Sequence, residues 1–289
     1  MIGIMPIAFL PPLPPDDGWV SHRQEVKCCR GSACYAALAA HFGTDSPKTL
    51  EQRVDKREPY DVDGDTAISN KYRRWRQGKA LPGDDTIAHV LKSSGGSIRL
   101  GFWRDLPLWE LLSPEPPSIY RLHQLLEAMP LMIKRTLFMD GMPNRQGRYQ
   151  HSPVERDQVL AIRNHGTLDA FLTLLCLARK GEVLEDDPRH YLPAAGAFDI
   201  LPRVLFAYRP LRYRWEGLFA CLDRIFWQRV YSIGAHYSFP VEHVRSGLEI
   251  LMANPAAELP LASGKRIRTS PEDPIARLWD KINPTESLT

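Results

Sequence analysis

The chain has 289 residues, of which 44% are hydrophobic and 25% are charged, proportions of a globular protein rather than of a disordered or membrane-spanning chain. At this length two domains are expected, because a domain usually contains about 100–200 residues. The net charge of +3 is too small to indicate a polyanionic partner by itself, so that argument depends on where the cations lie.

The cysteines and the first residues bear on the cellular compartment. The chain has five cysteines, an odd and sparse set that favours a reducing compartment over a disulfide framework. The apolar start, MIGIMPIAFL, has no basic residue before it and no A-x-A-like site after it, so it does not predict a signal peptide. No uninterrupted apolar run approaches the ~20 residues that span a bilayer. We therefore expect a cytoplasmic protein without a membrane span.

The N-terminal part is expected to be a Pro-rich arm over residues 1–19 and a helical module over residues 20–112. The sequence PPLPP in the arm favours an extended, semi-rigid chain. Apolar spacing, with glycines and prolines as stop and start signals, predicts helices over 32–42 (ended by Gly43), over 69–77 (ended by Gly78) and after Pro82.

The sequence SPEPPS at 113–118 is the clearest linker signal, and it leads into a helical bundle domain expected over residues 118–252. Predicted helices in the bundle are 119–129 with Ser118 as its cap, the apolar run 168–178, the amphipathic stretch 211–231, and 241–252.

Residues 253–289 are expected to be a tail whose sequence SPEDP (270–274) starts one short terminal helix. No strand pattern of period two extends beyond a few residues. The predicted fold class is therefore mainly α, with a helix-turn-helix-like N-terminal module and a C-terminal helical bundle.

The most informative stretch is KYRRWRQGK at 71–79, which places five cations and two aromatic residues in nine positions. Trp75 is expected to anchor this helix to the core. Cationic side chains on the exposed side can contact phosphates or guanine edges. The candidate nucleic-acid-binding residues are Lys71, Arg73, Arg74, Arg76 and Lys79.

From Trp75 the sequence continues as WRQGKALPGDDTIAHV. This stretch resembles the second half of the helix-turn-helix of Cro/C1-type (XRE-like) repressors, over about residues 67–92. In that family a recognition helix ends in W-x-x-G, a G-x-x-x-P turn follows, and a T-[LI]-x-x-[LVI] helix packs behind it. The matching positions here are Trp75, Gly78, Pro82, Thr86, Ile87 and Val90. The resemblance implies a regulator that binds DNA or RNA through the basic helix.

Two readings compete with nucleic-acid binding. Such a scaffold also serves as a protein–protein adaptor, for example a bacterial accessory or defence-system component, and the bundle offers a surface for a protein partner or for self-association. A second aromatic–basic stretch, YRPLRYRW at 208–215, can stack bases or anchor a protein interface, although arginines at a helix start commonly only extend into solvent.

Enzymatic and metal functions find less support, and we assign no catalytic residue, cofactor or metal. CCRGSAC (28–34) with His41 lacks the second ligand pair of a zinc site, and DVDGD (61–65) lacks the glycine and glutamate positions of a calcium loop. Cys34-Tyr35 has a faint likeness to the nucleophile site of papain-type proteases, which keeps a cysteine hydrolase as a third alternative.

Overall fold

The computed structural model describes residues 17–56, 70–138, 141–229, 231–232, 235–236, 239–257 and 259. These residues form two compact units. The N-terminal unit combines the described parts of Pro14–Leu112 with Ala207–Cys221, and the C-terminal unit combines the described parts of Ser113–Phe206 and Leu222–Thr289. Residues 207–221, which the sequence places within the 118–252 bundle, therefore pack with the N-terminal unit instead.

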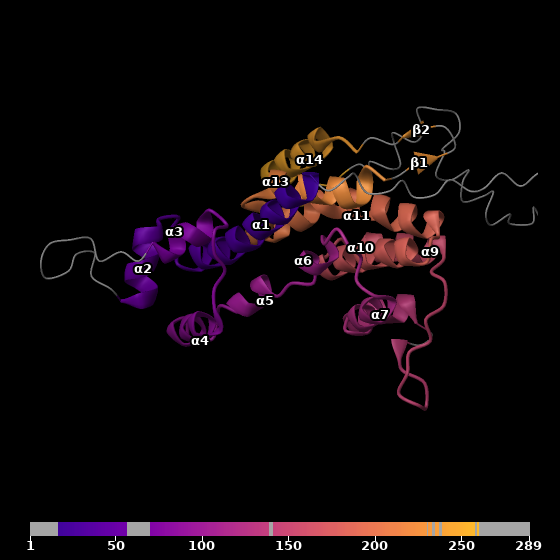
Figure 1. Cartoon of the computed structure of the whole chain (residues 1–289), viewed down its shortest axis with the longest axis horizontal. Helices are drawn as coiled ribbons and strands as arrows, with labels where there is room; N and C mark the ends of the chain where they lie inside the picture. Colours follow the sequence, from indigo (N-terminus) through magenta and orange to yellow (C-terminus); the bar gives the residue numbers. More distant parts are fainter. Residues whose placement is uncertain are drawn as a thin grey trace, which may run out of the picture. The chain divides into compact units, whose positions relative to one another are not determined.

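The N-terminal unit is built around one long helix, α1, to which α3, α5 and α12 pack. Figure 1 shows α3 beside α1. Small residues along α1, such as Gly31 and Ala33, allow this close approach. Its helices are α1 (Asp17–His41), α2 (Pro47–Asp55), α3 (Lys71–Arg76), α4 (Asp84–Ser93), α5 (Leu100–Arg104), α6 (Leu108–Leu111), α12 (Arg209–Arg212) and α13 (Trp215–Leu222).

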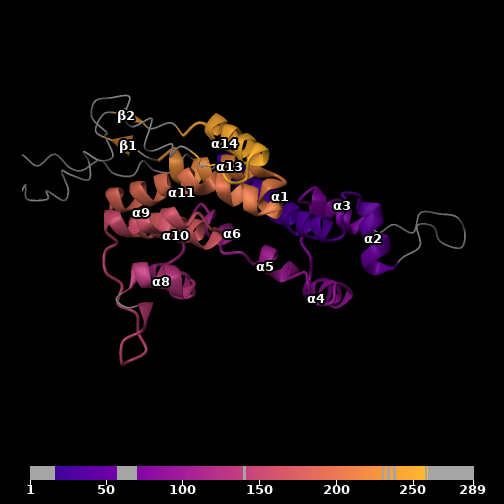
Figure 2. The same cartoon turned by 180° about the vertical axis from the view of Figure 1, so that it is seen from behind.

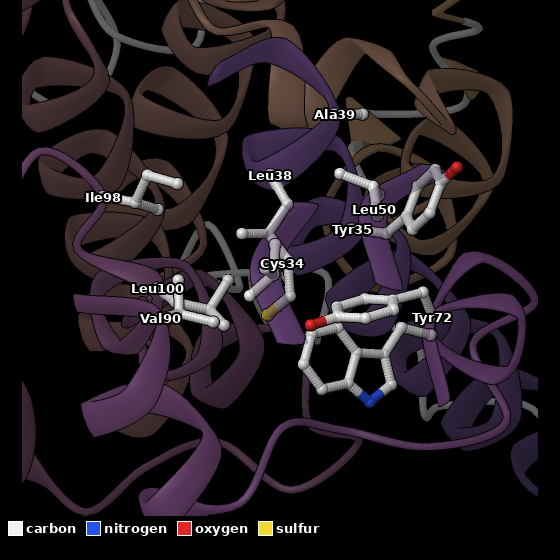
Figure 3. Close-up of a cluster of buried hydrophobic side chains, with 11 residues drawn as sticks. Cys34, Tyr35, Leu38, Ala39, Leu50, Tyr72, Val90, Ile98 and Leu100 are labelled. Carbon is white, nitrogen blue, oxygen red and sulfur yellow. The ribbon is translucent and has the colours of Figure 1, made fainter. Parts of the chain in front are cut away.

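The core of this unit gathers residues that lie far apart in the sequence. Cys34 and Leu38 of α1 lie in the middle of the cluster, with Val90 and Leu100 on one side and Tyr72 on the other (Figure 3). All five side chains are fully buried. Because α1 contributes to the whole cluster, it fixes the position of the short helices around it.

The C-terminal unit is centred on α10, a helix that is apolar on almost every side and packs against α7, α8 and α9. Both views show α11 beside it (Figures 1 and 2). The elements are α7 (Ile119–Glu127), α8 (Leu131–Leu137), α9 (Arg156–His165), α10 (Leu168–Val183), α11 (Asp187–Ala207), the π-helix η2 (Asp223–Trp227), β1 (Tyr231–Ser232), β2 (Ala235–His236) and α14 (Val241–Ala253). The two short strands pair antiparallel.

A buried ion cluster ties α10 to the turn after η2. The Glu182 carboxylate lies 2.6 Å from Nη1 of Arg179 and 2.6 Å from Nη1 of Arg229. Burial lowers the pKa of Arg179, against the effect of Glu182. Arg179 also donates to the carbonyl of Ser113. One carboxylate thus forms ion pairs with two buried cations.

The mainly α fold class is confirmed. Ser118 caps α7 by accepting a hydrogen bond from the amide of Arg121, and α10 and α14 lie where they were predicted. The stretch 211–231, predicted as one helix, is instead divided into α12, α13 and η2. The Pro-rich arm up to residue 16, the DVDGD loop and the SPEDP helix lie outside the described residues. No helix in the described part of the chain has the length and apolar character needed to cross a membrane.

Candidate nucleic-acid-binding surface

The basic helix α3 is short and is held by its aromatic residues. Asn70, with φ 55°, precedes the six-residue helix. Tyr72 and Trp75 are three positions apart, share a face, and are 0% and 2% exposed. Their rings meet edge to face with centroids 5.1 Å apart. The prediction that Trp75 anchors the helix to the core is therefore confirmed.

The C-terminal end of α3 rests on α1. The Ser32 hydroxyl of α1 donates to the carbonyl of Arg76 at 3.1 Å, and Cys28 Sγ lies 3.7 Å from the carbonyl oxygen of Gln77. Gly78 then adopts the left-handed conformation, with φ 66°. Side chains of α1 thus satisfy carbonyls that the end of a helix leaves without partners, and they fix the direction of α3.

At the start of α3, the candidate cation Lys71 is paired within the unit. Its Nζ lies 2.8 Å from a carboxylate oxygen of Asp55, the last residue of α2, and the Tyr72 hydroxyl donates to the same carboxylate at 3.2 Å. The Asp55 side chain is 11% exposed. Lys71 therefore helps to join α2 to α3, and its charge is largely neutralised there.

At the other end of α3, Arg76 faces a second carboxylate. Its Nη2 lies 3.8 Å from Asp45, and its guanidinium is 6.0 Å from the centroid of the Tyr35 ring. The Tyr213 hydroxyl also donates to Asp45, at 3.2 Å. Burial first, and then Asp45, raises the pKa of Tyr213, so this hydroxyl stays a neutral donor. Arg76 thus belongs to a small polar cluster that connects α1, α3 and α12.

Three of the five candidate cations remain as a surface group. Arg73, Arg74 and Lys79 are exposed, and no described carboxylate forms an ion pair with them. Lys27 on α1 is exposed as well. It precedes Cys28, whose backbone lies against Gly78 in the turn after α3. Sequence reasoning missed Lys27 because it lies about fifty positions before Lys79 and in no motif. We call Arg73, Arg74 and Lys79 the basic surface.

The second aromatic–basic stretch is used inside the N-terminal unit. Arg214 makes two hydrogen bonds to the Glu25 carboxylate of α1, at 2.8 and 2.9 Å. Tyr208 packs against Trp103 with ring centroids 6.2 Å apart. These contacts give the stretch a structural role, and they explain why residues 207–221 belong to this unit.

Several positions of the repressor-like motif have the burial or backbone conformation that the resemblance implies, while the motif itself stays a prediction. Trp75 and Val90 are buried, and Gly78 has the left-handed conformation. Pro82 does not open α4 directly, since the helix begins at Asp84 with Gly83 as its N-cap. Fifteen residues separate α2 from α3, whereas a helix-turn-helix joins its helices by a turn of about 3–4 residues.

The geometry contradicts a papain-like role for Cys34. This residue lies in the middle of α1 rather than at a helix start, and it is 0% exposed. Burial raises the pKa of its thiol to about 12, which removes the thiolate that a nucleophile needs.

A second buried thiol, Cys221, interacts with Cys29 and His22 of α1, which lie almost two hundred positions earlier, so no local sequence signal predicts this contact. Cys29 first, and then His22, lowers the pKa of the Cys221 thiol, against the effect of burial. The pKa of Cys29 is correspondingly raised. Cys221 is only 1% exposed, so no substrate reaches it in this conformation.

The described residues contain no group of three or more His, Cys, Asp or Glu side chains arranged to hold a metal ion. Comparisons of the chain with family models, with curated proteins and with solved structures gave no match.

Proposed function

We propose that the N-terminal unit binds nucleic acid, with Arg73, Arg74 and Lys79 contacting the phosphate backbone. The observation that carries the proposal is a contrast within α3 and the turn after it. Lys71 and Arg76, the first and last residues of the helix, face carboxylates, whereas the three cations of the basic surface do not. A phosphate group would supply the missing anion.

The rigidity of the support adds to this argument. Contacts of α1 and α2 hold both ends of α3, and Tyr72 and Trp75 fix its buried face. Exposed cations on such a helix lose less conformational freedom on binding than cations on a loop. The repressor resemblance over the basic helix and the turn after it points the same way.

Binding of fluorescein-labelled duplex DNA, single-stranded DNA and duplex RNA is to be measured by anisotropy from about 50 mM salt upward. Each phosphate contact contributes about 0.9 to the slope of log affinity against log salt on duplex DNA. The variant Arg73→Ala/Arg74→Ala should therefore flatten that slope by up to about 1.8, and Lys79→Ala by about 0.9. Alanine favours helix, so α3 should survive both changes.

The matched control is Lys92→Ala/Arg99→Ala, which removes two exposed cations of the same unit outside α3. It changes the net charge equally and should leave the slope nearly unchanged. An equal effect of the two double variants would mean that overall charge, not the basic surface, governs binding. If the wild-type protein binds none of the three probes at about 50 mM salt, the proposal is wrong and a protein–protein adaptor becomes the better account.

A further inference from the structure

A cavity of about 240 Å³ lies in the C-terminal unit, among α7, α9, α10, α11 and the segment before α9. Its walls are mostly apolar, and they include Ile119, Val159, Leu177 and Leu192. Leu184, at the end of α10, also lines the cavity and is 47% exposed, so the space has an edge that solvent reaches. An apolar cavity of this size in a helical unit is a common form of small-molecule site.

The charged side chains that line the cavity are both cationic. Lys180 and Arg189 line it, and none of the described residues that line it is acidic. Arg189 is paired with Asp186 at 2.9 Å, whereas no described carboxylate forms an ion pair with Lys180. Burial, with a further contribution from Arg189, lowers the pKa of Lys180. An anion beside this ammonium would remove an energetic cost that the empty cavity carries.

A second group of the cavity lacks a partner. His123 and His151 stack face to face with centroids 3.6 Å apart, and His151 Nε2 lies 2.7 Å from a Glu127 oxygen. The Nε2 atom of His123 is buried and has no hydrogen-bond partner among the described residues. Burial first, and then His151, lowers the pKa of His123 to about 4, so near neutral pH its ring is uncharged. In the tautomer that carries its proton on Nε2, the neutral His123 ring can donate a hydrogen bond to an oxygen of a ligand.

The volume limits the size of that ligand. An apolar cavity of about 150 Å³ holds one benzene molecule, so the present cavity has room for roughly ten non-hydrogen atoms. This corresponds to one ring with a short acidic side chain, or to a branched acid of similar size.

We propose that this cavity binds a small monocarboxylate, with its apolar body between α7, α9, α10 and α11 and its carboxylate beside Lys180, within reach of Arg189 and His123. Such a site would make the C-terminal unit a receptor for an amphipathic organic acid. This inference does not depend on the nucleic-acid proposal, because it concerns other residues and its test contains no nucleic acid.

The test is calorimetric titration of the full chain with 3-phenylpropionate and with its neutral amide, 3-phenylpropionamide. Wild type should bind the carboxylate with a Kd of about 1 mM or tighter, and the amide at least about tenfold more weakly, as expected for loss of a charge-assisted bond. Lys180→Met should remove the preference by weakening the carboxylate alone, and Lys180→Arg should retain it.

Two further variants separate the site from general effects. Leu184→Trp, at the exposed edge, should fill the cavity and weaken both compounds, whereas Lys92→Met removes an exposed lysine of the other unit and should change neither. Thermal melting establishes that each variant is folded. The proposal is overturned if wild type binds neither compound, if it binds both equally, or if Lys180→Met keeps the preference.

Discussion

The backbones of Gly31 in α1 and Gly78 after α3 touch: a Cβ atom on Gly31 would lie 3.0 Å from the Cα atom of Gly78. The same Cβ would lie 3.1 Å from the carbonyl oxygen of Trp75. No side chain separates the two segments at this point. A Cβ at Gly78 would overlap the backbone of α1, and one at Gly31 would force the two segments slightly apart, so the direction of the basic surface depends on this contact.

Gly78→Ala is expected to destabilise the N-terminal unit by about 2–5 kcal/mol, the sum of a left-handed alanine and an overpacked contact. Its Cβ would lie 2.1 Å from the Cα atom of Cys28. The matched control is Gly95→Ala, because Gly95 also has a positive φ, of 60°, but nothing lies within 4 Å of its Cβ position. That control should cost only about 1–2 kcal/mol. Urea denaturation measures both, and equal losses would show that the contact with α1 does not matter.

Trp75→Ala should destabilise the same unit by about 3–5 kcal/mol, the usual cost of emptying a large aromatic site. Arg74→Ala, one position earlier and exposed, should change stability by no more than about 0.5 kcal/mol. Thermal and urea melting of the two variants test this contrast. If Trp75→Ala melts like wild type but loses nucleic-acid binding, the indole contacts the ligand and not the core.

Asp45→Asn should release Arg76 and thereby enlarge the basic surface. Because the Arg76 and Asp45 side chains are 44% and 50% exposed, little stability should be lost. If Arg76 then reaches a phosphate, the salt slope on duplex DNA should steepen by about 0.9. Asp84→Asn is the control, since it removes one carboxylate whose partner is Arg104 on α5. Equal strengthening by both variants would reveal an effect of net charge alone.

Glu182→Gln should cost about 3–5 kcal/mol, because it removes the carboxylate that lies 2.6 Å from the guanidinium groups of both Arg179 and Arg229, two buried cations. Glu115→Gln, at an exposed glutamate of the same unit, should cost no more than about 0.5 kcal/mol. Urea denaturation near neutral pH compares the two. Similar losses would mean that the buried cations find other partners.

Glu182 also makes a prediction about acid. Burial alone would raise its pKa, but Arg179 and Arg229 lower it below the ordinary value of 4.5. A lowered folded-state pKa means that the stabilisation is complete above 4.5 and is lost as the pH falls through the folded-state pKa. Burial lowers the pKa of His190 to about 4 in the folded protein. Both wild type and Glu182→Gln should therefore lose folding stability as the pH falls below the ordinary histidine value of 6.5. Below pH 4.5 only wild type should also lose the part of its free energy of unfolding that depends on the ionised Glu182 carboxylate, as measured by urea denaturation. Parallel curves there would contradict the ion cluster.

The sequence predicted those helices whose signals are local. Ser118 caps α7 and the apolar run of α10 is buried, because a cap and a continuous apolar stretch depend only on neighbouring residues. The first half of α1, from Asp17, was missed because its charged residues hide its periodicity. The expected single helix over 211–231 is interrupted at Arg214, between α12 and α13. This residue forms a hydrogen bond to Glu25, a partner 189 positions earlier in the sequence.

The candidate site shows the same limit. The five cations and the buried Trp75 were visible in the sequence, but the carboxylates that occupy two of the cations were not. Asp55 comes from α2 and Asp45 from the loop before it, and only folding brings them to α3. The sequence therefore predicted a basic surface that was too large, because it included Lys71 and Arg76, which face carboxylates in the folded unit.

The N-terminal unit is assembled from two separate stretches of chain, and this has a consequence for synthesis. Its second stretch begins at Ala207, after the whole of Ser113–Phe206 has been made. At the usual rate of about 5–20 residues per second, the roughly 170 residues from the end of α1 to α12 take about 8–34 s to make, so α1 exists that long before α12 can pack against it. During that interval the surface of α1 that carries Glu25 and Cys29 stays exposed, because the residues that cover it have not been made. Nascent chains stopped near residue 112 should therefore be the ones that engage chaperones.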